Sequence, residues 1–130
     1  MDIHRITEHI IGAAITVHRE LGPGLLESAY HACVAHELVQ RSLRFERQKP
    51  VSIMYKGKQI DCGYRVDLLV EGEVIVELKS VERLDPIHMA QILTYLKLSG
   101  RHVGLLINFN VRVLKDGLRR IVLNFPESGR

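Results

Sequence analysis

The sequence feature that most constrains the fold is a nearly uninterrupted apolar run from residue 103 to residue 109. It reads Val-Gly-Leu-Leu-Ile-Asn-Phe and carries no charged side chain. A strand without polar alternation is typical of a sheet whose two faces are both covered. The run therefore predicts a central strand inside a layered domain.

Helical spacing dominates the first forty residues. Apolar side chains recur every three or four positions from Ile3 to Leu21, and Asp2 is a good N-cap for that helix. Gly22-Pro23-Gly24 ends it, and a second helix is expected from about Leu26 to Arg41. The chain therefore begins with two consecutive helices.

The apolar period then changes from that of a helix to that of strands. Alternation over Val51–Tyr55 predicts a strand that turns at Lys56-Gly57 into a second extended run over residues 59–70. Glu71-Gly72 is a further turn signal, and it leads into a third strand over residues 74–79. Three consecutive antiparallel strands are expected here.

A third helix should begin at Asp85-Pro86, because Asp85 can cap it and proline fits the first turn. It should reach about Leu98 and end at Gly100. A last strand is expected over residues 118–125, and residues 126–130 should fray. The order α-α-β-β-β-α-β-β predicts an α/β (α+β) fold in which helices flank a mixed sheet.

Length and composition agree with one ordinary globular domain spanning residues 1–130, since 46% of the residues are apolar and 25% are charged. The start lacks the pattern of a signal peptide, and no stretch is long enough to span a membrane. Cys33 and Cys62 are expected to be buried, reduced thiols. Together these features predict a cytoplasmic protein.

The net charge of +3 suits a polyanionic partner without requiring one. Basic residues gather in three segments and could contact phosphates, or they could simply form a solvated surface. These residues are Arg41, Arg44, Arg47 and Lys49, then Lys56 and Lys58, then Arg112, Lys115, Arg119 and Arg120. No histidine pairs with a cysteine at zinc-finger spacing.

Three charged residues interrupt segments that otherwise read as interior strands. Asp67 lies between Val66 and a run of apolar residues, and Glu77 and Lys79 break the third strand. An unpaired buried charge costs several kcal/mol, so such residues should be paired, bound to metal or solvated in a cleft. A structural salt bridge on an exposed sheet face and a functional site are both compatible with this pattern.

Hairpin geometry separates these two interpretations. A regular two-residue loop at Glu71-Gly72 would send the carboxylates of Asp67 and Glu77 to opposite faces of the sheet. A loop with an odd number of residues, or a bulge, would put them on the same face. Two carboxylates on one face suit Mg²⁺, and a neighbouring lysine could position a water molecule against a phosphate. A functional site therefore requires an odd loop or a bulge.

The pattern of Asp67 with Glu77-Leu78-Lys79 resembles the signature of the PD-(D/E)XK nuclease superfamily, which has a restriction-endonuclease-like fold. The segment Gly24–Tyr30 also matches the GxxExxY motif of one family within it. The resemblance extends over nearly the whole chain, and Val66 stands where the superfamily name has proline. Further matching segments are residues 105–109, 114–117 and 120–122.

The resemblance implies that Asp67 and Glu77 are metal ligands for Mg²⁺ or Mn²⁺, with the backbone carbonyl of Leu78 as a third. It implies that Lys79 serves the attacking water. It also makes Glu27 an additional acidic residue of the site and Gln91 an accessory polar group near the phosphate or metal.

Some of these residues also have simpler explanations. Glu27 would stabilise the first turn of a helix by its charge alone. Gln91, with His88 and Tyr95 on the same side of the third helix, could face the cleft or the solvent. We expect His88 to be a surface residue and Tyr30 to be a core residue with a hydrogen-bonded hydroxyl.

The function implied is a metal-dependent nuclease that hydrolyses phosphodiester bonds, with DNA expected as the substrate rather than RNA. The alternative is a non-catalytic module that binds nucleic acid or protein and keeps the nuclease fold. A third possibility is a purely structural network of ion pairs. The small size of the domain suggests that it acts as a homodimer.

Overall fold

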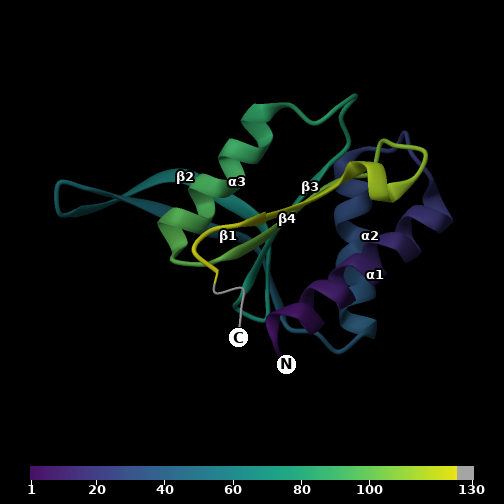
Figure 1. Ribbon diagram of the computed structural model, residues 1–130, viewed down its shortest axis with the longest axis horizontal. Helices are drawn as coiled ribbons and strands as arrows, with labels where there is room; N and C mark the ends of the chain where they lie inside the picture. Colours follow the sequence, from purple (N-terminus) through teal and green to yellow (C-terminus); the bar gives the residue numbers. More distant parts are fainter. Residues whose placement is uncertain (126–130) are drawn as a thin grey trace.

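The computed structural model describes residues 1–125 and shows three helices packed on a five-stranded sheet (Figure 1). The helices are α1 (Ile3–Leu21), α2 (Glu27–Gln40) and α3 (Pro86–Ser99). The strands are β1 (Phe45–Tyr55), β2 (Lys58–Val70), β3 (Val74–Lys79), β4 (Val103–Asn108) and β5 (Leu118–Val122), and a short 3₁₀ helix, η1 (Leu114–Gly117), precedes β5. The expected order of elements is confirmed. The expected fraying concerns residues 126–130, which lie outside the described part.

The sheet is mixed, with the strands in the order β1-β2-β3-β4-β5. β3 and β4 are parallel and pair in register from Val74 with Val103 to Lys79 with Asn108. The other neighbouring strands are antiparallel. Helix α3 forms the crossover that a parallel pair requires. The predicted fold class is therefore confirmed.

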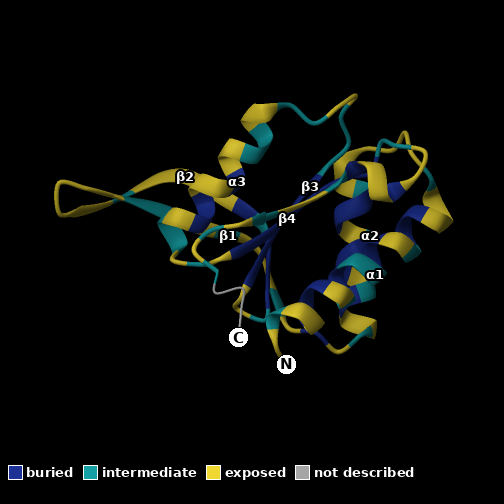
Figure 2. Cartoon of the chain, viewed as in Figure 1, coloured by how far each residue is buried: buried dark blue, intermediate teal, exposed yellow. Residues whose placement is uncertain are grey.

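Helices cover both faces of the sheet, and each face has its own apolar core (Figure 2). Under α1 and α2 the core includes Leu68, Val76 and Leu105. Under α3 it includes Leu69, Ile75 and Leu106. Every residue of β4 is buried, as expected of a central strand covered on both sides.

Strand β1 begins at Phe45, six residues before the expected start at Val51. The added segment contains charged residues and Pro50, a composition that argues against an interior strand. β1 is an edge strand that pairs only with β2, and an edge tolerates both proline and charge. The hairpin of β1 and β2 projects well beyond the body of the molecule (Figure 1, left), and its tip is exposed (Figure 2).

The ends of the helices follow the expected capping chemistry. The Asp2 side chain accepts a hydrogen bond from the amide of Arg5 at 2.9 Å, and α1 then runs to Leu21. Asp85 is the N-cap of α3, and Gly100 ends that helix in the left-handed conformation, with φ of 71°. These caps fix where the helices meet the sheet.

The apolar residues of β2 change faces at Asp67. Leu68 and Val70 belong to the core under α1 and α2, whereas Val66 belongs to the core under α3. Strict alternation would place residues two apart on the same face, so the strand is irregular here. The register of β1 against β2 also skips Gln48, which has a φ of 52°. The irregularity separates Asp67 from ordinary strand pairing.

Neither cysteine forms a disulfide in the described part of the chain, but only Cys33 is even partly buried. Cys62 is exposed, so the expectation that both thiols are buried is wrong. The reason is that Cys62 lies on the projecting part of β2, which no helix covers. Among residues 1–125, no helix combines the length and the apolar character needed to cross a membrane.

Candidate metal and active site

The loop between β2 and β3 has three residues, Glu71 to Glu73, because Val70 pairs with Val74. Gly72 in its centre has a left-handed φ of 68°, a conformation that glycine adopts at little cost. The paired register continues to Leu68 opposite Val76. One step further along the two strands, Asp67 lies opposite Glu77. The predicted odd loop is confirmed.

Asp67 and the segment Glu77–Leu78 exchange two hydrogen bonds. The amide of Asp67 donates to Oε2 of Glu77 at 2.6 Å, and the amide of Leu78 donates to Oδ2 of Asp67 at 2.8 Å. Each carboxylate is thus held by a backbone amide of the opposite strand. The two acidic groups lie side by side with little freedom to separate.

Glu77 is buried, with 6% of its surface exposed. Burial, followed by the negative charge of Asp67, raises the pKa of Glu77 to about 7. The hydrogen bond from the Asp67 amide and the charges of Lys79 and His31 act in the opposite direction. The site therefore concentrates negative charge where solvent stabilises it poorly, an environment that a bound cation would improve.

Lys79 is the last residue of β3 and is partly buried. It lies two residues after Glu77, so both side chains point to the same face of the sheet. Its charge is close enough to lower the pKa of Glu77. Asp67, Glu77 and Lys79 are thus brought together, as the sequence pattern predicted.

His31 is a member of the site that sequence reasoning did not assign. Its Nε2 atom lies 3.2 Å from Oδ1 of Asp67, and the side chain is mostly buried on α2. The one available sequence signal was its spacing, because His31 follows Glu27 by four residues and shares its helix face. A histidine on α2 therefore contacts a carboxylate on the sheet, that of Asp67.

Glu27 lies at the border of the site rather than within it. It is exposed and opens α2, one turn before His31. The preceding segment is held near the end of β3, where the Ser80 hydroxyl donates a hydrogen bond to the carbonyl of Leu25 at 2.6 Å. Glu27 is therefore on the helix face that leads to Asp67, and its catalytic role stays a prediction.

Gln91 is exposed on α3 and lines a shallow pocket with Tyr64 and Tyr95. Its role near the phosphate or metal also stays a prediction. His88 on the same helix has a structural role, since its Nδ1 accepts a hydrogen bond from the amide of Asp85 at 3.0 Å. His88 is partly buried, and this cap explains it better than the expected surface position.

Tyr95 on α3 lies close enough to the carboxylates to feel their charge. It is buried in the core that also contains Val66 and Ile75. Burial raises its pKa, and the negative charges of Glu77 and Asp67 raise it further. The hydroxyl therefore stays protonated and able to donate a hydrogen bond.

Tyr30 belongs to the core, as predicted. Its ring stacks on Phe109 with centroids 4.4 Å apart. Its hydroxyl donates to the carbonyl of Gly22 at 2.6 Å and accepts from the amide of Leu25 at 3.2 Å. The tyrosine of the GxxExxY segment thus fixes the turn that leads into α2.

The donors at the site fit Mg²⁺ or Mn²⁺, which take a few oxygen ligands and keep several waters. The carboxylates of Asp67 and Glu77 on one face satisfy that requirement, and burial destabilises the ionised form of Glu77. Within residues 1–125, no group of three or more histidine, cysteine or acidic side chains is arranged to hold a metal ion. An ion held by two carboxylates would keep coordination positions for water and phosphate.

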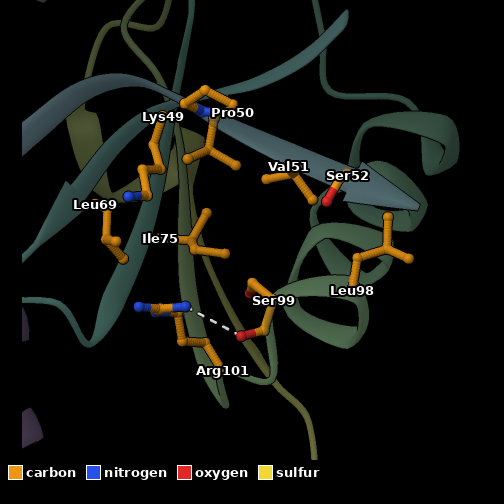
Figure 3. A pocket seen from close by; sticks show the side chains of 10 residues that line it. Lys49, Pro50, Val51, Ser52, Leu69, Ile75, Leu98, Ser99 and Arg101 are labelled. Atoms are coloured by element: carbon orange, nitrogen blue, oxygen red, sulfur yellow. Dashed lines mark hydrogen bonds between the residues drawn. The ribbon is translucent and has the colours of Figure 1, made fainter. Parts of the chain in front are cut away.

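A separate cavity of about 170 Å³ is lined by residues of β1, the neighbouring strands and the end of α3 (Figure 3). Neither Asp67 nor Glu77 lines it. Apolar side chains such as Ile75 and Leu69 form its floor, and Lys49 and Arg101 lie at its edge. Arg101 is engaged with backbone carbonyls, donating to Gly72 and Ser99 at 3.0 Å each. This cavity and the acidic site are therefore distinct features.

The basic residues near the end of α2 do not all face the solvent. Arg41 is partly buried against α1, where its guanidinium lies 3.3 Å from Nδ1 of His9 and close to Gly12. Its position indicates a role in packing the two helices rather than in contacting phosphate. Arg47, by contrast, is exposed on β1.

Residues 4–121 match a family model described as the PD-(D/E)XK nuclease superfamily. The match covers most of the chain and includes all the residues of the site. No significant match was found among curated proteins or among solved structures.

Proposed function

Because the chain belongs to the PD-(D/E)XK nuclease superfamily, we propose that it is a Mg²⁺- or Mn²⁺-dependent nuclease that hydrolyses phosphodiester bonds, with DNA as its substrate. The observation that carries the proposal is the pair formed by Asp67 and Glu77, held side by side through reciprocal backbone hydrogen bonds. Lys79 on the same face completes the set. A module that only binds has no need of a lysine beside two carboxylates.

Each residue has a defined role in this proposal. Asp67 and Glu77 hold the ion, and the Leu78 carbonyl is the third ligand. When bound, the ion neutralises charge that develops on the phosphate oxygens and lowers the pKa of a coordinated water. Lys79 orients the attacking water and stabilises the negative charge of the transition state. His31 positions Asp67 through their 3.2 Å contact.

Two further residues supplement this set. Glu27, on the helix face that leads to Asp67, is the additional acidic group. Gln91, which lines the pocket with Tyr95, is the accessory polar group near the phosphate or metal. The match of Gly24–Tyr30 to the GxxExxY motif supports membership of that family, because Tyr30 fixes the turn that places Glu27 at the start of α2.

A non-catalytic binding module is the alternative function. It would keep the fold and a residual ion site, and it would bind nucleic acid or protein without cleaving it. A structural network of ion pairs would show no metal affinity, and the loss of one partner would lower stability alone. Action as a homodimer is a further part of the proposal, and light scattering with and without nucleic acid tests it.

Metal binding and cleavage, measured on the same samples, test the proposal. Calorimetry with Mn²⁺ should show binding to the wild type and a loss of more than about 100-fold in Asp67→Asn. A panel of DNA and RNA substrates should show metal-dependent cleavage that Lys79→Ala abolishes. Lys97→Ala is the matched control, because Lys97 is exposed on α3 and belongs neither to the site nor to the basic segments that could contact phosphate. Metal binding without cleavage of any substrate would favour the binding module.

A further inference from the structure

A pocket beside the acidic site has no role in the chemistry described so far. It measures about 190 Å³ and lies between β2 and the outer side of α3. Its lining combines two aromatic rings, small or apolar side chains and two polar groups. These residues are Tyr64, Ile87, Ala90, Gln91, Thr94 and Tyr95.

The pocket adjoins the carboxylates through both of its tyrosines. Tyr64 precedes Asp67 by three residues in β2, a distance of about 10 Å along a strand. Tyr64 also shares a face with Val66, which packs in the same core as Tyr95. The charges of Asp67 and Glu77 are near enough to Tyr95 to raise its pKa. A nucleotide next to a phosphate at the ion site would therefore reach this pocket.

Tyr64 presents an aromatic surface of the kind on which bases stack, and the ring of Tyr95, which is only 5% exposed, lies beside it. Tyr64 is 42% exposed, and its ring centroid lies 6.1 Å from that of Tyr95 with the planes inclined by 57°. A dry cavity of about 150 Å³ is large enough for benzene, so this pocket admits an aromatic ring. The exposed amide of Gln91 offers both a donor and an acceptor to the edge of a base.

The hairpin that carries Tyr64 has the charge that a nucleic-acid strand requires. Residues 54–65 contain three basic side chains and one acidic one, a difference of two positive charges. The basic residues are Lys56, Lys58 and Arg65. The projecting arm can thus follow a phosphate backbone while the pocket at its base takes up one aromatic ring.

We infer that this pocket receives an unpaired nucleobase adjacent to the scissile phosphate, so that the preferred substrate is single-stranded nucleic acid or a duplex with an unpaired nucleotide. The inference rests on the proposed nuclease function and specifies its substrate class. Bases inside a duplex are stacked on their neighbours, and extracting one has a cost that an unpaired base does not incur.

Binding in the absence of metal tests the inference, because no hydrolysis then takes place. Fluorescence anisotropy should be measured with three oligonucleotides: a single strand, a fully paired duplex, and the same duplex with one unpaired nucleotide. The wild type should bind the two substrates with unpaired bases more tightly than the full duplex. Tyr64→Ala should weaken those two interactions by about 5- to 150-fold and leave duplex binding unchanged.

Val39→Ala is the control, because Val39 is 59% exposed near the end of α2, outside both the pocket and the projecting hairpin. It should change each affinity less than twofold. Tyr64→Phe retains a ring that can stack and should restore binding to near the wild-type value. Since Tyr64 is substantially exposed, the alanine variant should fold, and circular dichroism checks this.

Several results would overturn the inference. One is that the wild type binds all three substrates with equal affinity. Another is that Tyr64→Ala loses the same affinity for all three. A third is that Tyr64→Ala changes from dimer to monomer by sedimentation. The last would make the pocket a contact between copies of the chain. If metal-dependent cleavage of single strands persists unchanged in Tyr64→Ala, the pocket is rejected while the nuclease function stands. If the wild type neither binds nor cleaves nucleic acid, the nuclease function itself is rejected.

Discussion

The backbone amide of Asp67 donates a hydrogen bond to the carboxylate of Glu77, 2.6 Å away. The contact joins the main chain of one strand to the side chain of its neighbour, and Asp67 in turn accepts from the amide of Leu78. The positions of both acidic groups are therefore set by the backbone rather than by flexible side chains. Catalytic groups that are held in this way need little reorganisation when substrate binds.

Stability should depend on pH through Glu77. Burial and the charge of Asp67 raise its pKa from 4.5 to about 7 in the folded protein. Between these two values the folded state retains a proton that the unfolded chain has lost. The free energy of unfolding should therefore fall as the pH rises from 4.5 to 7, by about 3 kcal/mol in total, and then level off. Urea denaturation of the metal-free protein across this range measures the effect.

Glu77→Gln supplies the comparison for this pH dependence. Glutamine keeps an oxygen that can accept from the Asp67 amide, but it does not ionise. The contribution of residue 77 to the change of unfolding free energy with pH should disappear. The variant should be more stable than the wild type above pH 7. An unchanged slope in the variant would show that other groups cause the pH dependence.

Metal should stabilise the folded protein more at pH 8 than at pH 6. At pH 6 the ion must displace the proton of Glu77, whereas at pH 8 the carboxylate is already ionised. At pH 8, Mn²⁺ at about 100 times its Kd should add roughly 2.7 kcal/mol to the free energy of unfolding. Thermal unfolding with Mn²⁺ and with a chelator measures this difference, and an equal shift at both pH values would contradict the expectation.

His31→Ala should weaken metal binding without abolishing it. The loss of its contact with Asp67 removes a positioning group, and such changes typically cost about 10- to 100-fold in affinity. Calorimetry with Mn²⁺ is the measurement. His36→Ala is the control, since His36 is exposed on the same helix, and it should bind Mn²⁺ like the wild type.

Asn108→Ala should destabilise the fold close to the site. Asn108 is buried, and its side chain bonds both the amide and the carbonyl of Val81 at 3.0 Å. The substitution removes the acceptor that the amides of Val81 and Asn110 share, while the Val81 carbonyl keeps its bond from the Asn110 side chain at 3.3 Å. The loss should cost about 1–3 kcal/mol. Chemical denaturation should show this loss for Asn108→Ala and almost none for Gln40→Ala, whose amide side chain is exposed at the end of α2. Equal stability of the two variants would refute the assigned role of Asn108.

Much of the fold follows from local chemistry in the sequence. The caps at Asp2 and Asp85, the stop at Gly100 and the apolar run of β4 are each fixed by neighbouring residues, and each lies where it was expected. The acidic site was predictable for a similar reason. Glu77 and Lys79 interrupt an otherwise apolar strand. The odd number of residues in the loop 71–73 then places Glu77 on the same face as Asp67.

The remaining features depend on contacts between distant parts of the chain. His31 reaches Asp67 only because α2 packs across the sheet, and no local pattern fixes a contact over 36 residues. The start of β1 at Phe45 was missed because its charges suit only an edge strand, and strand order is not a local property. The exposure of Cys62 likewise depends on how far the hairpin extends beyond α3.

The three-residue loop at Glu71–Glu73 also has an evolutionary consequence. Most surface loops tolerate gain or loss of a residue, because their ends stay in place while the tip adjusts. Here the gain or loss of one residue would turn Glu77 away from Asp67 while leaving both acids in the sequence. A lineage could thus lose the site without replacing any acidic residue. Loop length is therefore a heritable requirement as strict as the identity of the carboxylates.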